Sequence, residues 1–178
     1  MEFTNHPLSK FKYCPSCGSI NFKILSKLIK KCEDCNFSYS YKVSGGVAVI
    51  IKDKNNKILL TKRKFDPSKG TLDLPGGFID IGENAELSCE REIKEETGLN
   101  LNEGKLKYLF SLPNVYKFSD FNVCTLDLFY EYFIENFNNL IPGDDVDEIV
   151  LVDKKNIDVE KFGLQSIRQG IKKYIEEF

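Results

Sequence analysis

Three glutamates stand close together in one short stretch, and their spacing suits metal chemistry. Glu92, Glu95 and Glu96 lie within "REIKEETGL", and helix residues three or four positions apart share a face. Each like-charge pair would destabilise the helix by about 0.2–0.5 kcal/mol, and acids near its C-terminus also oppose the helix dipole. Divalent cations would turn this repulsion into attraction, and oxygen-only ligands suit Mg²⁺ or Mn²⁺. The alternative is a solvated charged face.

The residues around the glutamates predict a helix that can hold them in place. Ala85, Cys89 and Ile93 recur at intervals of four and give the helix an apolar stripe. Gly98 follows the glutamates and is expected to end the helix. The carboxylates would therefore project from an anchored helix.

A longer pattern surrounds the glutamates. Gly77 is followed after five residues by Glu83, and after seven more by "REIKEETGL", so the pattern runs over residues 77–99. It resembles the complete signature of the Nudix hydrolases. The resemblance implies an α/β/α sandwich with a mixed sheet, which uses divalent cations to hydrolyse a nucleoside diphosphate linked to another moiety. A dinucleotide such as NADH, or an ADP-ribose-like compound, would be the substrate.

The resemblance also implies a role for each residue of the pattern. The ligands of Mg²⁺ or Mn²⁺ would be four glutamates and one main-chain carbonyl, namely Gly76, Glu83, Glu92, Glu95 and Glu96. Glu83 would assist the metal site. Arg91 would orient a neighbouring glutamate, so Arg91, Glu92 and Glu95 form the expected catalytic set.

Hydrolysis of a phosphoanhydride also needs an in-line water and a group that accepts its proton. In the Nudix family this base is sometimes the glutamate at the position of Glu92 and sometimes an acid on a distant loop. Asp145, Asp147 and Glu148 are the loop candidates, and Glu148 matches an acid often found before the last strand. The one histidine, His6, is expected to be unstructured and solvated, so no Ser-His or Cys-His relay is expected.

Four of the six cysteines form two CxxC pairs. Cys14 and Cys17 precede Cys32 and Cys35, with fourteen residues between the pairs, a pattern typical of a four-thiolate Zn²⁺ site. Four sulfurs fill a tetrahedral shell, so the zinc is expected to be structural. Since a module of about forty residues has little core, zinc would supply most of its folding free energy. A redox role for the pairs is the alternative.

The sequence therefore divides into a zinc ribbon, residues 1–41, and an α/β domain, residues 42–178. Residues 1–42 hold seven Lys/Arg and three Asp/Glu, while the remainder holds eighteen and twenty-four. This surplus does not by itself indicate nucleic acid as a partner. The remaining thiols, Cys89 and Cys124, are expected in the core.

A four-cysteine ribbon ahead of a Nudix domain resembles the NADH pyrophosphatase branch. That branch carries S-Q-P-W-P-F-P-x-S after the Nudix motif, and the same place here reads "SLPNVYKFS", residues 111–119. Ser111, Pro113 and Ser119 agree, and Tyr116 replaces the phenylalanine, but the Gln, the Trp and two prolines differ. We expect this loop to shape the substrate pocket, and its departure from the pattern leaves the substrate open.

Further residues could contact a nucleotide. Tyr116, Phe65 and Phe110 could stack on a base, although an aromatic beside a strand is often part of the core. Arg63 and Lys64 could meet a phosphate, although surface charges are ordinarily solvated.

Apolar runs indicate the elements that position these residues. Strands are expected within residues 43–53, 57–63, 72–77, 105–112, 124–136 and 147–153, and a helix within 162–178. Strands interleaved with two helices indicate an α/β architecture. No apolar run approaches the length of a membrane span and no signal peptide is recognisable, so we expect a cytoplasmic protein without a membrane partner. The resemblance to ribbon-bearing Nudix proteins, which are often dimeric, also implies a homodimer.

A second class of function is also consistent with the sequence. The ribbon would bind RNA or a protein, and the Nudix domain would sense a nucleotide with little catalysis. The intact set of glutamates favours the enzyme, because a binding module has no need of such an acidic cluster.

Overall fold

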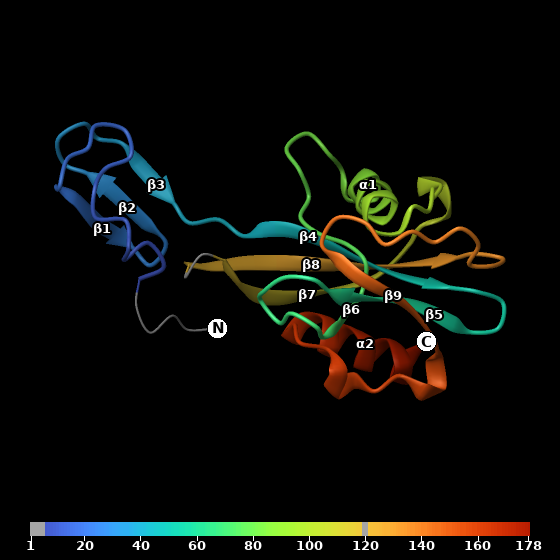
Figure 1. Ribbon diagram of the computed structural model, residues 1–178. Coiled ribbons are helices and arrows are strands. Elements are labelled where there is room, and N and C mark those ends of the chain that lie inside the picture. The colour runs from blue at the N-terminus through green and yellow to red at the C-terminus, as the bar shows by residue number, and fades with distance from the viewer. Residues whose placement is uncertain (1–5, 119–120) are drawn as a thin grey trace. The chain divides into compact units, whose positions relative to one another are not determined.

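The computed structural model describes residues 6–118 and 121–178. The chain divides between Val43 and Ser44 into two compact units, which are described separately (Figure 1). The first unit contains a three-stranded antiparallel sheet in the order β1-β2-β3. Its strands are β1 (Phe22–Ser26), β2 (Ile29–Cys32) and β3 (Ser38–Ser40). The sequence had not indicated β2.

Two matching turns shape the first unit. The N–H of Gly18 donates to the carbonyl of Cys14, and the N–H of Asn36 donates to that of Cys32, at 2.8 and 3.0 Å. Both donors have positive φ angles, 76° and 63°, a conformation that Gly and Asn adopt most readily. Phe22 packs with the two cysteines as the small core. The turns bring each CxxC pair to the same centre.

The second unit is built on one six-stranded sheet and two helices. The strand order is β6-β5-β4-β8-β7, and β9 pairs with β5. The strands are β4 (Ser44–Lys52), β5 (Lys57–Arg63), β6 (Leu72–Asp73), β7 (Lys107–Phe118), β8 (Phe121–Phe133) and β9 (Val146–Asp153). The helices are α1 (Ala85–Thr97) and α2 (Gln165–Glu177), with short 3₁₀ turns at Glu103–Lys105, Lys154–Asn156 and Val159–Lys161. Since β4 and β8 run parallel and the other pairs antiparallel, the sheet is mixed.

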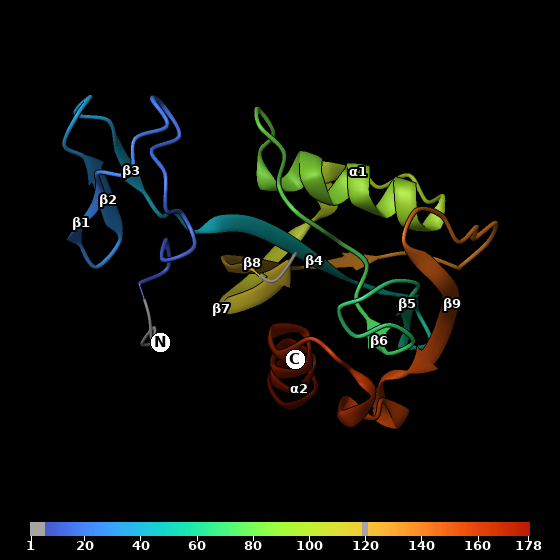
Figure 2. The ribbon, with the colours of Figure 1, turned by 60° about the vertical axis from the view of Figure 1, so that its left-hand side comes forward.

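The side chains of β4 alternate between two hydrophobic cores. Val47 and Val49 pack with residues of α1, whereas Ala48 and Ile50 pack with residues of α2. Because successive residues of a strand point to opposite faces, this alternation requires a helix on each face. Figure 2 shows the sheet between the two helices. The predicted α/β/α sandwich with a mixed sheet is confirmed.

Strand β7 extends further than the sequence indicated. The segment expected as a loop, "SLPNVYKF", continues the strand and pairs with β8 as far as Phe118, while Ser119 lies outside the described residues. Pro113 is tolerated because β7 is at the edge of the sheet, where one side of the strand needs no ladder hydrogen bonds. The segment therefore presents side chains from a strand rather than from a loop.

A chain segment replaces β5 beside the first half of β4. The N–H of Val47 donates to the carbonyl of Gly77, and that of Val49 donates to Pro75, both at 2.9 Å. Gly76 has a φ of 145°, and a Cβ there would lie 2.2 Å from the carbonyl oxygen of Val47. A glycine is required at this close approach, which brings the turn against α1.

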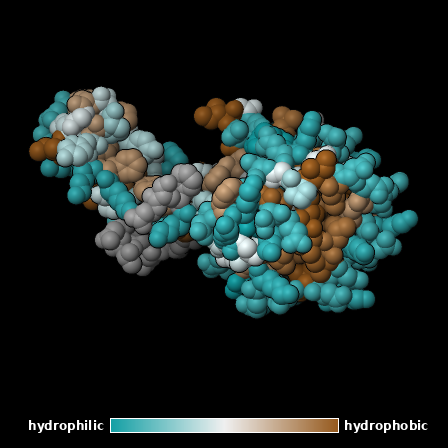
Figure 3. All heavy atoms as spheres, viewed as in Figure 1, coloured by the Kyte–Doolittle hydropathy of each residue, from teal (hydrophilic) through white to brown (hydrophobic). Residues whose placement is uncertain are grey.

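The surface of the described chain is mixed in polarity. Hydrophilic residues cover much of the face shown in Figure 3, with hydrophobic residues between them. The first unit leaves Tyr13, Ile20 and Ile24 more than half exposed, as expected for a small module that cannot enclose its apolar side chains. None of the described helices has the length and apolar character needed to cross a membrane.

Candidate active site

Helix α1 holds the glutamates through defined ends and a buried stripe. Asn84 caps its start, accepting a hydrogen bond from the N–H of Leu87 at 2.8 Å, and Gly98 ends it in the left-handed conformation. Cys89 and Ile93 are fully buried. The predicted apolar stripe and helix end are confirmed, and the burial of α1 fixes the direction of its charged side chains.

The three glutamates do not share one environment. Glu92 and Glu96 are 9 % and 6 % exposed, whereas the side chain of Glu95 is 49 % exposed. A carboxylate oxygen of Glu96 accepts the N–H of Gly76 at 2.9 Å. A Cβ on Gly77 would lie 2.4 Å from a carboxylate oxygen of Glu92. A solvated charged face is therefore wrong for Glu92 and Glu96, which lie against the glycine turn.

Arg91 joins the carboxylates around this turn. Its guanidinium binds both oxygens of Glu83, at 2.8 and 3.0 Å, and also reaches Glu92 at 2.8 Å and Glu95 at 3.2 Å. It donates to the carbonyl of Phe78 at 3.0 Å as well. A planar guanidinium is suited to such forked contacts. Three carboxylates are thereby positioned by one cation.

Burial makes ionisation of the two buried glutamates less favourable. Burial raises the pKa of Glu92, although Arg91 opposes this, and raises the pKa of Glu96 well above its usual range. By contrast, hydrogen bonds from Arg91 lower the pKa of Glu83. Asp145 adds further negative charge near Glu92 and Glu96. A divalent cation would stabilise the ionised carboxylates, and the all-oxygen donors fit Mg²⁺ or Mn²⁺.

The four cysteines of the first unit form a compact cluster. Their sulfurs all lie within 4.8 Å of one another, and no other group of three or more possible ligands gathers this closely in the described part of the chain. Sulfur pairs from opposite turns, Cys14 with Cys35 and Cys17 with Cys32, are 3.7 Å apart. The backbone N–H of Cys35 helps to lower the pKa of Cys32 to about 7. The cluster fits a four-thiolate metal ion.

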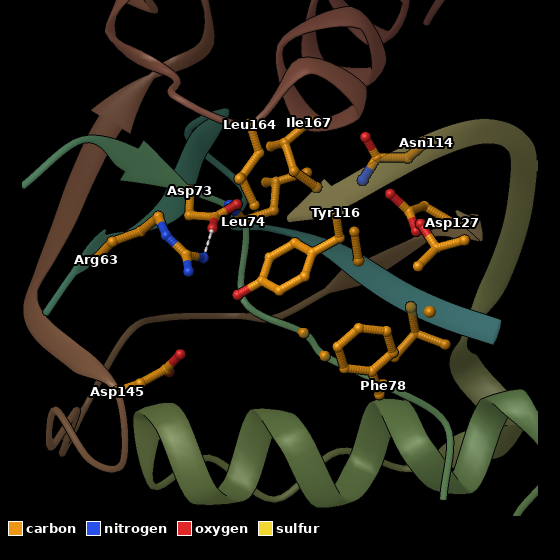
Figure 4. A pocket seen from close by; sticks show the side chains of 16 residues that line it. Arg63, Asp73, Leu74, Phe78, Asn114, Tyr116, Asp127, Asp145, Leu164 and Ile167 are labelled. Atoms are coloured by element: carbon orange, nitrogen blue, oxygen red, sulfur yellow. Dashed lines mark hydrogen bonds and ion pairs between the residues drawn. The ribbon is translucent and has the colours of Figure 1, made fainter. Parts of the chain in front are cut away.

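A pocket of about 140 Å³ opens beside the glycine turn. Its lining comes from β4, β7, β8, the Gly76–Phe78 turn and the segment around the start of α2. Figure 4 shows Arg63, Asp73 and Asp145 toward one side, Asn114 and Asp127 toward the other, and Tyr116 between them. Charged and aromatic groups from distant parts of the sequence thus converge on one cavity.

The structure separates the three candidate acids near β9. Asp145 lines the pocket, and its carbonyl accepts the N–H of Lys64 at 2.8 Å. Glu148 instead faces Lys62 across the β5–β9 pair at 3.7 Å, lines a different depression and is largely exposed. Asp147 is also exposed. The structure therefore brings Asp145, and not Glu148, to the pocket.

The suggested substrate contacts also separate. Tyr116 lines the pocket, and its ring meets Phe78 edge to face at 5.7 Å. Arg63 lines it too, but its guanidinium pairs with Asp73 at 2.6 Å. Phe65 is 56 % exposed and does not line the pocket. Phe110 stacks on the buried Phe129 at 4.9 Å, so it belongs to the α2 core.

Two expectations about single residues need correction. His6 is not unstructured: its ring hydrogen-bonds to the carbonyl of Ser26 at 2.9 Å and accepts the N–H of Leu8. Cys124 is only partly buried, whereas Cys89 is fully buried. Burial raises the pKa of Cys89 to about 12, which makes its thiol unreactive.

Sequence reasoning did not single out Asp73, Asn114, Thr125 or Asp127 as pocket residues. One signal was present: Asp127 interrupts the apolar run of β8, and an acid on a central strand needs a partner or a ligand. The other three acquire their position only from strand pairing.

Comparison with known proteins agrees with the fold and the motif. The NUDIX domain family matches residues 43–178, so the chain belongs to the Nudix family. An ADP-ribose pyrophosphatase from Methanocaldococcus jannaschii is 52 % identical over 64 residues, which is 36 % of this chain and 38 % of the relative. The NAD-capped RNA hydrolase NudC from Haemophilus influenzae is 31 % identical over 111 residues, 61 % of this chain and 41 % of the relative.

Each of these matches covers only about two fifths of the relative's length. Among solved structures, a NUDIX hydrolase from Nitrosomonas europaea has a TM-score of 0.68 at 22 % identity, over 93 % of this chain and 91 % of that one. The NUDIX domain of Shewanella oneidensis NrtR, solved with ADP ribose, has a TM-score of 0.60 at 21 % identity, over 76 % and 88 %. At these identities the likeness shows the fold alone.

Proposed function

We propose that this protein is a divalent-metal-dependent hydrolase that cleaves the pyrophosphate of a nucleoside diphosphate linked to another moiety. The observation that carries the proposal is the placement of the motif carboxylates around the Gly76–Gly77 turn, which also lines a pocket that holds aromatic and acidic side chains. Burial disfavours the ionised forms of Glu92 and Glu96, even though Arg91 pairs with Glu92 and the N–H of Gly76 with Glu96. Divalent cations bound at this site would stabilise the ionised forms.

The side chains of the motif have different roles in this proposal. Glu92, Glu95 and Glu96 supply oxygen ligands. Arg91, itself paired with Glu83, fixes the directions of Glu92 and Glu95, and the N–H of Gly76 holds Glu96. When bound there, Mg²⁺ or Mn²⁺ would neutralise phosphate oxygens and lower the pKa of the attacking water.

Two carboxylates are placed to accept the proton of the water. Glu92 lies in the motif and is buried against Gly77, and Asp145 lines the pocket and is near enough to influence both Glu92 and Glu96 electrostatically. We assign this role to Asp145 in preference to Glu148. A positioned general base contributes about 10²–10⁴-fold to a rate, so Asp145→Asn should lower kcat by that order.

ADP-ribose is the first candidate substrate, because a stretch of 64 residues is 52 % identical to a protein named ADP-ribose pyrophosphatase. NAD(H) is the second, because a longer but weaker match is to proteins named NAD-capped RNA hydrolase. The segment "SLPNVYKFS" departs from the signature of the NADH pyrophosphatase branch, and its residues Asn114 and Tyr116 line the pocket. This departure favours ADP-ribose over NAD(H).

A substrate panel tests the proposal. ADP-ribose, NADH, FAD, diadenosine polyphosphates and nucleoside triphosphates would each be incubated with the full chain and Mg²⁺ or Mn²⁺, and products followed by chromatography. We expect turnover of at least one compound that stops on addition of EDTA. If no compound is hydrolysed but nucleotide or RNA binding is measured, the result would support a binding module instead.

The ribbon completes the proposal. We propose that its cysteine cluster binds one structural Zn²⁺, because four thiols occupy all positions of a tetrahedral ion. The zinc would stabilise a unit whose core consists chiefly of Phe22 and two of the cysteines. Metal analysis of the purified chain should give one zinc per molecule.

A further inference from the structure

One end of the pocket carries polar side chains for which the described residues supply no hydrogen-bond or ionic partner. Asn114 on β7 lies opposite Thr125 on β8, and Asp127 follows two residues along β8, so all three share one face of the sheet. Thr125 is 4 % exposed, and its hydroxyl has no hydrogen-bond partner in the part of the chain that the structure describes. Leaving such a buried group unpaired is unfavourable. A ligand that fills the pocket would satisfy it.

The carboxylate of Asp127 is held open to the same cavity. It lies over the backbone of Gly46, where a Cβ would come within 2.9 Å of its oxygen. Among the described residues no cation pairs with it, in contrast to Asp73 at the other end, which pairs with Arg63. A carboxylate is an acceptor only, so the ligand must offer hydrogen-bond donors here.

The two ends of the pocket differ in their polar groups, as Figure 4 shows. Both ends carry an acid, but only the end with Arg63 and Asp145 holds a guanidinium, and Asp145 is near the buried glutamates that would bind divalent cations. We therefore assign the pyrophosphate to that end and the base to the end with Asn114 and Asp127. Tyr116 lies between these ends (Figure 4), and its contact with Phe78 provides aromatic surface for a flat ring.

The donor and acceptor pattern selects among bases. Adenine offers an exocyclic amino donor beside ring-nitrogen acceptors, whereas guanine and hypoxanthine carry a carbonyl oxygen in place of that amine. An acid can accept from the amine, and an amide or hydroxyl can donate to a ring nitrogen. We propose that Asn114, Thr125 and Asp127 recognise the amino-bearing edge of adenine and so determine base specificity. This inference rests on the proposed function, because it concerns the same pocket.

Comparison of adenine and hypoxanthine ligands tests the inference. For hydrolysis, kcat/KM would be measured for ADP-ribose and IDP-ribose with the wild type and with Asp127→Asn. We expect the wild type to prefer ADP-ribose by about 10-fold or more, the usual discrimination of one good base contact. The amide of the variant can donate to the carbonyl of hypoxanthine, so the preference should fall to within about 3-fold.

A binding measurement separates this inference from the proposed function. Calorimetric titration with AMP and IMP needs no turnover, so it reports base recognition even if none of the pyrophosphates is hydrolysed. Asp158→Asn is the matched control, since it makes the same charge change outside the pocket and an asparagine preserves the cap that Asp158 provides. It should keep the wild-type preference.

Thr125→Val supplies a second variant that is expected to fold. Removing an unpaired buried hydroxyl should leave the melting temperature unchanged or raise it, while the KM for ADP-ribose rises several-fold and kcat stays near the wild-type value. An unchanged KM would show that the hydroxyl has no ligand. The inference is overturned if the wild type does not distinguish the two bases, or if Asp127→Asn keeps the full preference in both assays.

Discussion

The two candidate metal sites differ in how completely the folded chain assembles them. In the ribbon, two matched turns bring four cysteine sulfurs within 4.8 Å of one another. In the Nudix domain, Arg91 spreads Glu83, Glu92 and Glu95 around its guanidinium. Protonated thiols are neutral and can gather, whereas carboxylates repel and need a cation between them. The cysteine sulfurs are therefore already gathered in the folded chain, whereas the motif carboxylates are held apart around a guanidinium.

The largest expected effect comes from replacing one of the motif glutamates. Glu95→Gln keeps the shape of the side chain but removes its charge, so turnover should fall by about 10²–10⁴-fold, as expected when a group that holds catalytic charge is lost. Because Glu95 is half exposed, the melting temperature should change little. Steady-state kinetics measures the turnover, and thermal unfolding measures the melting temperature. Glu90→Gln, the same change in the same helix, is the control, and near-normal activity of Glu95→Gln would refute its role.

Replacing one cysteine of the ribbon cluster should have a structural effect. Cys32→Ser removes one of four sulfurs, and the ribbon should lose its zinc and its fold, since structural zinc supplies roughly 10–16 kcal/mol in small modules. The Nudix domain should keep its melting temperature because the chain divides after Val43. Metal analysis and amide dispersion in NMR spectra report each unit. Cys124→Ser, outside the cluster, should retain zinc; a folded, zinc-free ribbon would contradict the prediction.

A subtler variant sharpens the role of the glycine turn. Gly77→Ala would place a Cβ 2.4 Å from a carboxylate oxygen of Glu92, so Glu92 must shift away from its position. Since a displacement of about 1 Å can cost up to 10²-fold in rate, kcat should fall by about 10- to 100-fold. Gly104→Ala lies outside the motif and the pocket lining, and its Cβ would meet only the end of the Asn102 side chain, so it should be close to wild type. Wild-type kinetics for Gly77→Ala would mean that the position of Glu92 is unimportant.

The smallest effect concerns Glu131, a carboxylate that the chain neutralises itself. It accepts from Lys52 and from the hydroxyl of Tyr174, each at 2.6 Å. Burial opposes ionisation, but these partners hold the pKa of Glu131 below its usual range. Its contribution is therefore present above the unfolded-state pKa and lost as pH falls through the folded value.

Replacement of Glu131 tests this stabilisation. Glu131→Gln should reduce the free energy of unfolding by about 1 kcal/mol at neutral pH and flatten its decline in acid, measured by urea titration. Unlike the buried glutamates of the motif, Glu131 needs no metal, so added Mg²⁺ or Mn²⁺ should not rescue the variant. An unchanged pH profile would rule out the stabilising role of the ionised group.

Much of the fold could be predicted because the elements have clear periodic patterns. The strands of residues 44–52 and 57–63 contain the apolar runs VAVII and ILL, and α2 repeats its apolar residues at helical spacing. The extension of β7 could not be predicted, since Pro113 and Asn114 disfavour strands and only their position on an edge strand permits them. The second ribbon strand, "IKKC", was missed because two lysines obscure its pattern.

The candidate site was only partly predictable. Arg91 and the glutamates belong to a contiguous motif, so sequence spacing places them on one helix. That Glu92 and Glu96 are buried while Glu95 is exposed depends on the turn at Gly76 and Gly77, which approaches from another strand.

The sequence by itself determined the two kinds of ligand and the helix that carries the glutamates, because local spacing fixes which side chains share a turn or a helix face. The tertiary structure decided which distant residues join them. Strand pairing brought Asn114 beside Thr125, directed Asp145 to the pocket and turned Glu148 toward Lys62. Such contacts follow from register and sheet order, which depend on the packing of the whole domain rather than on any one segment.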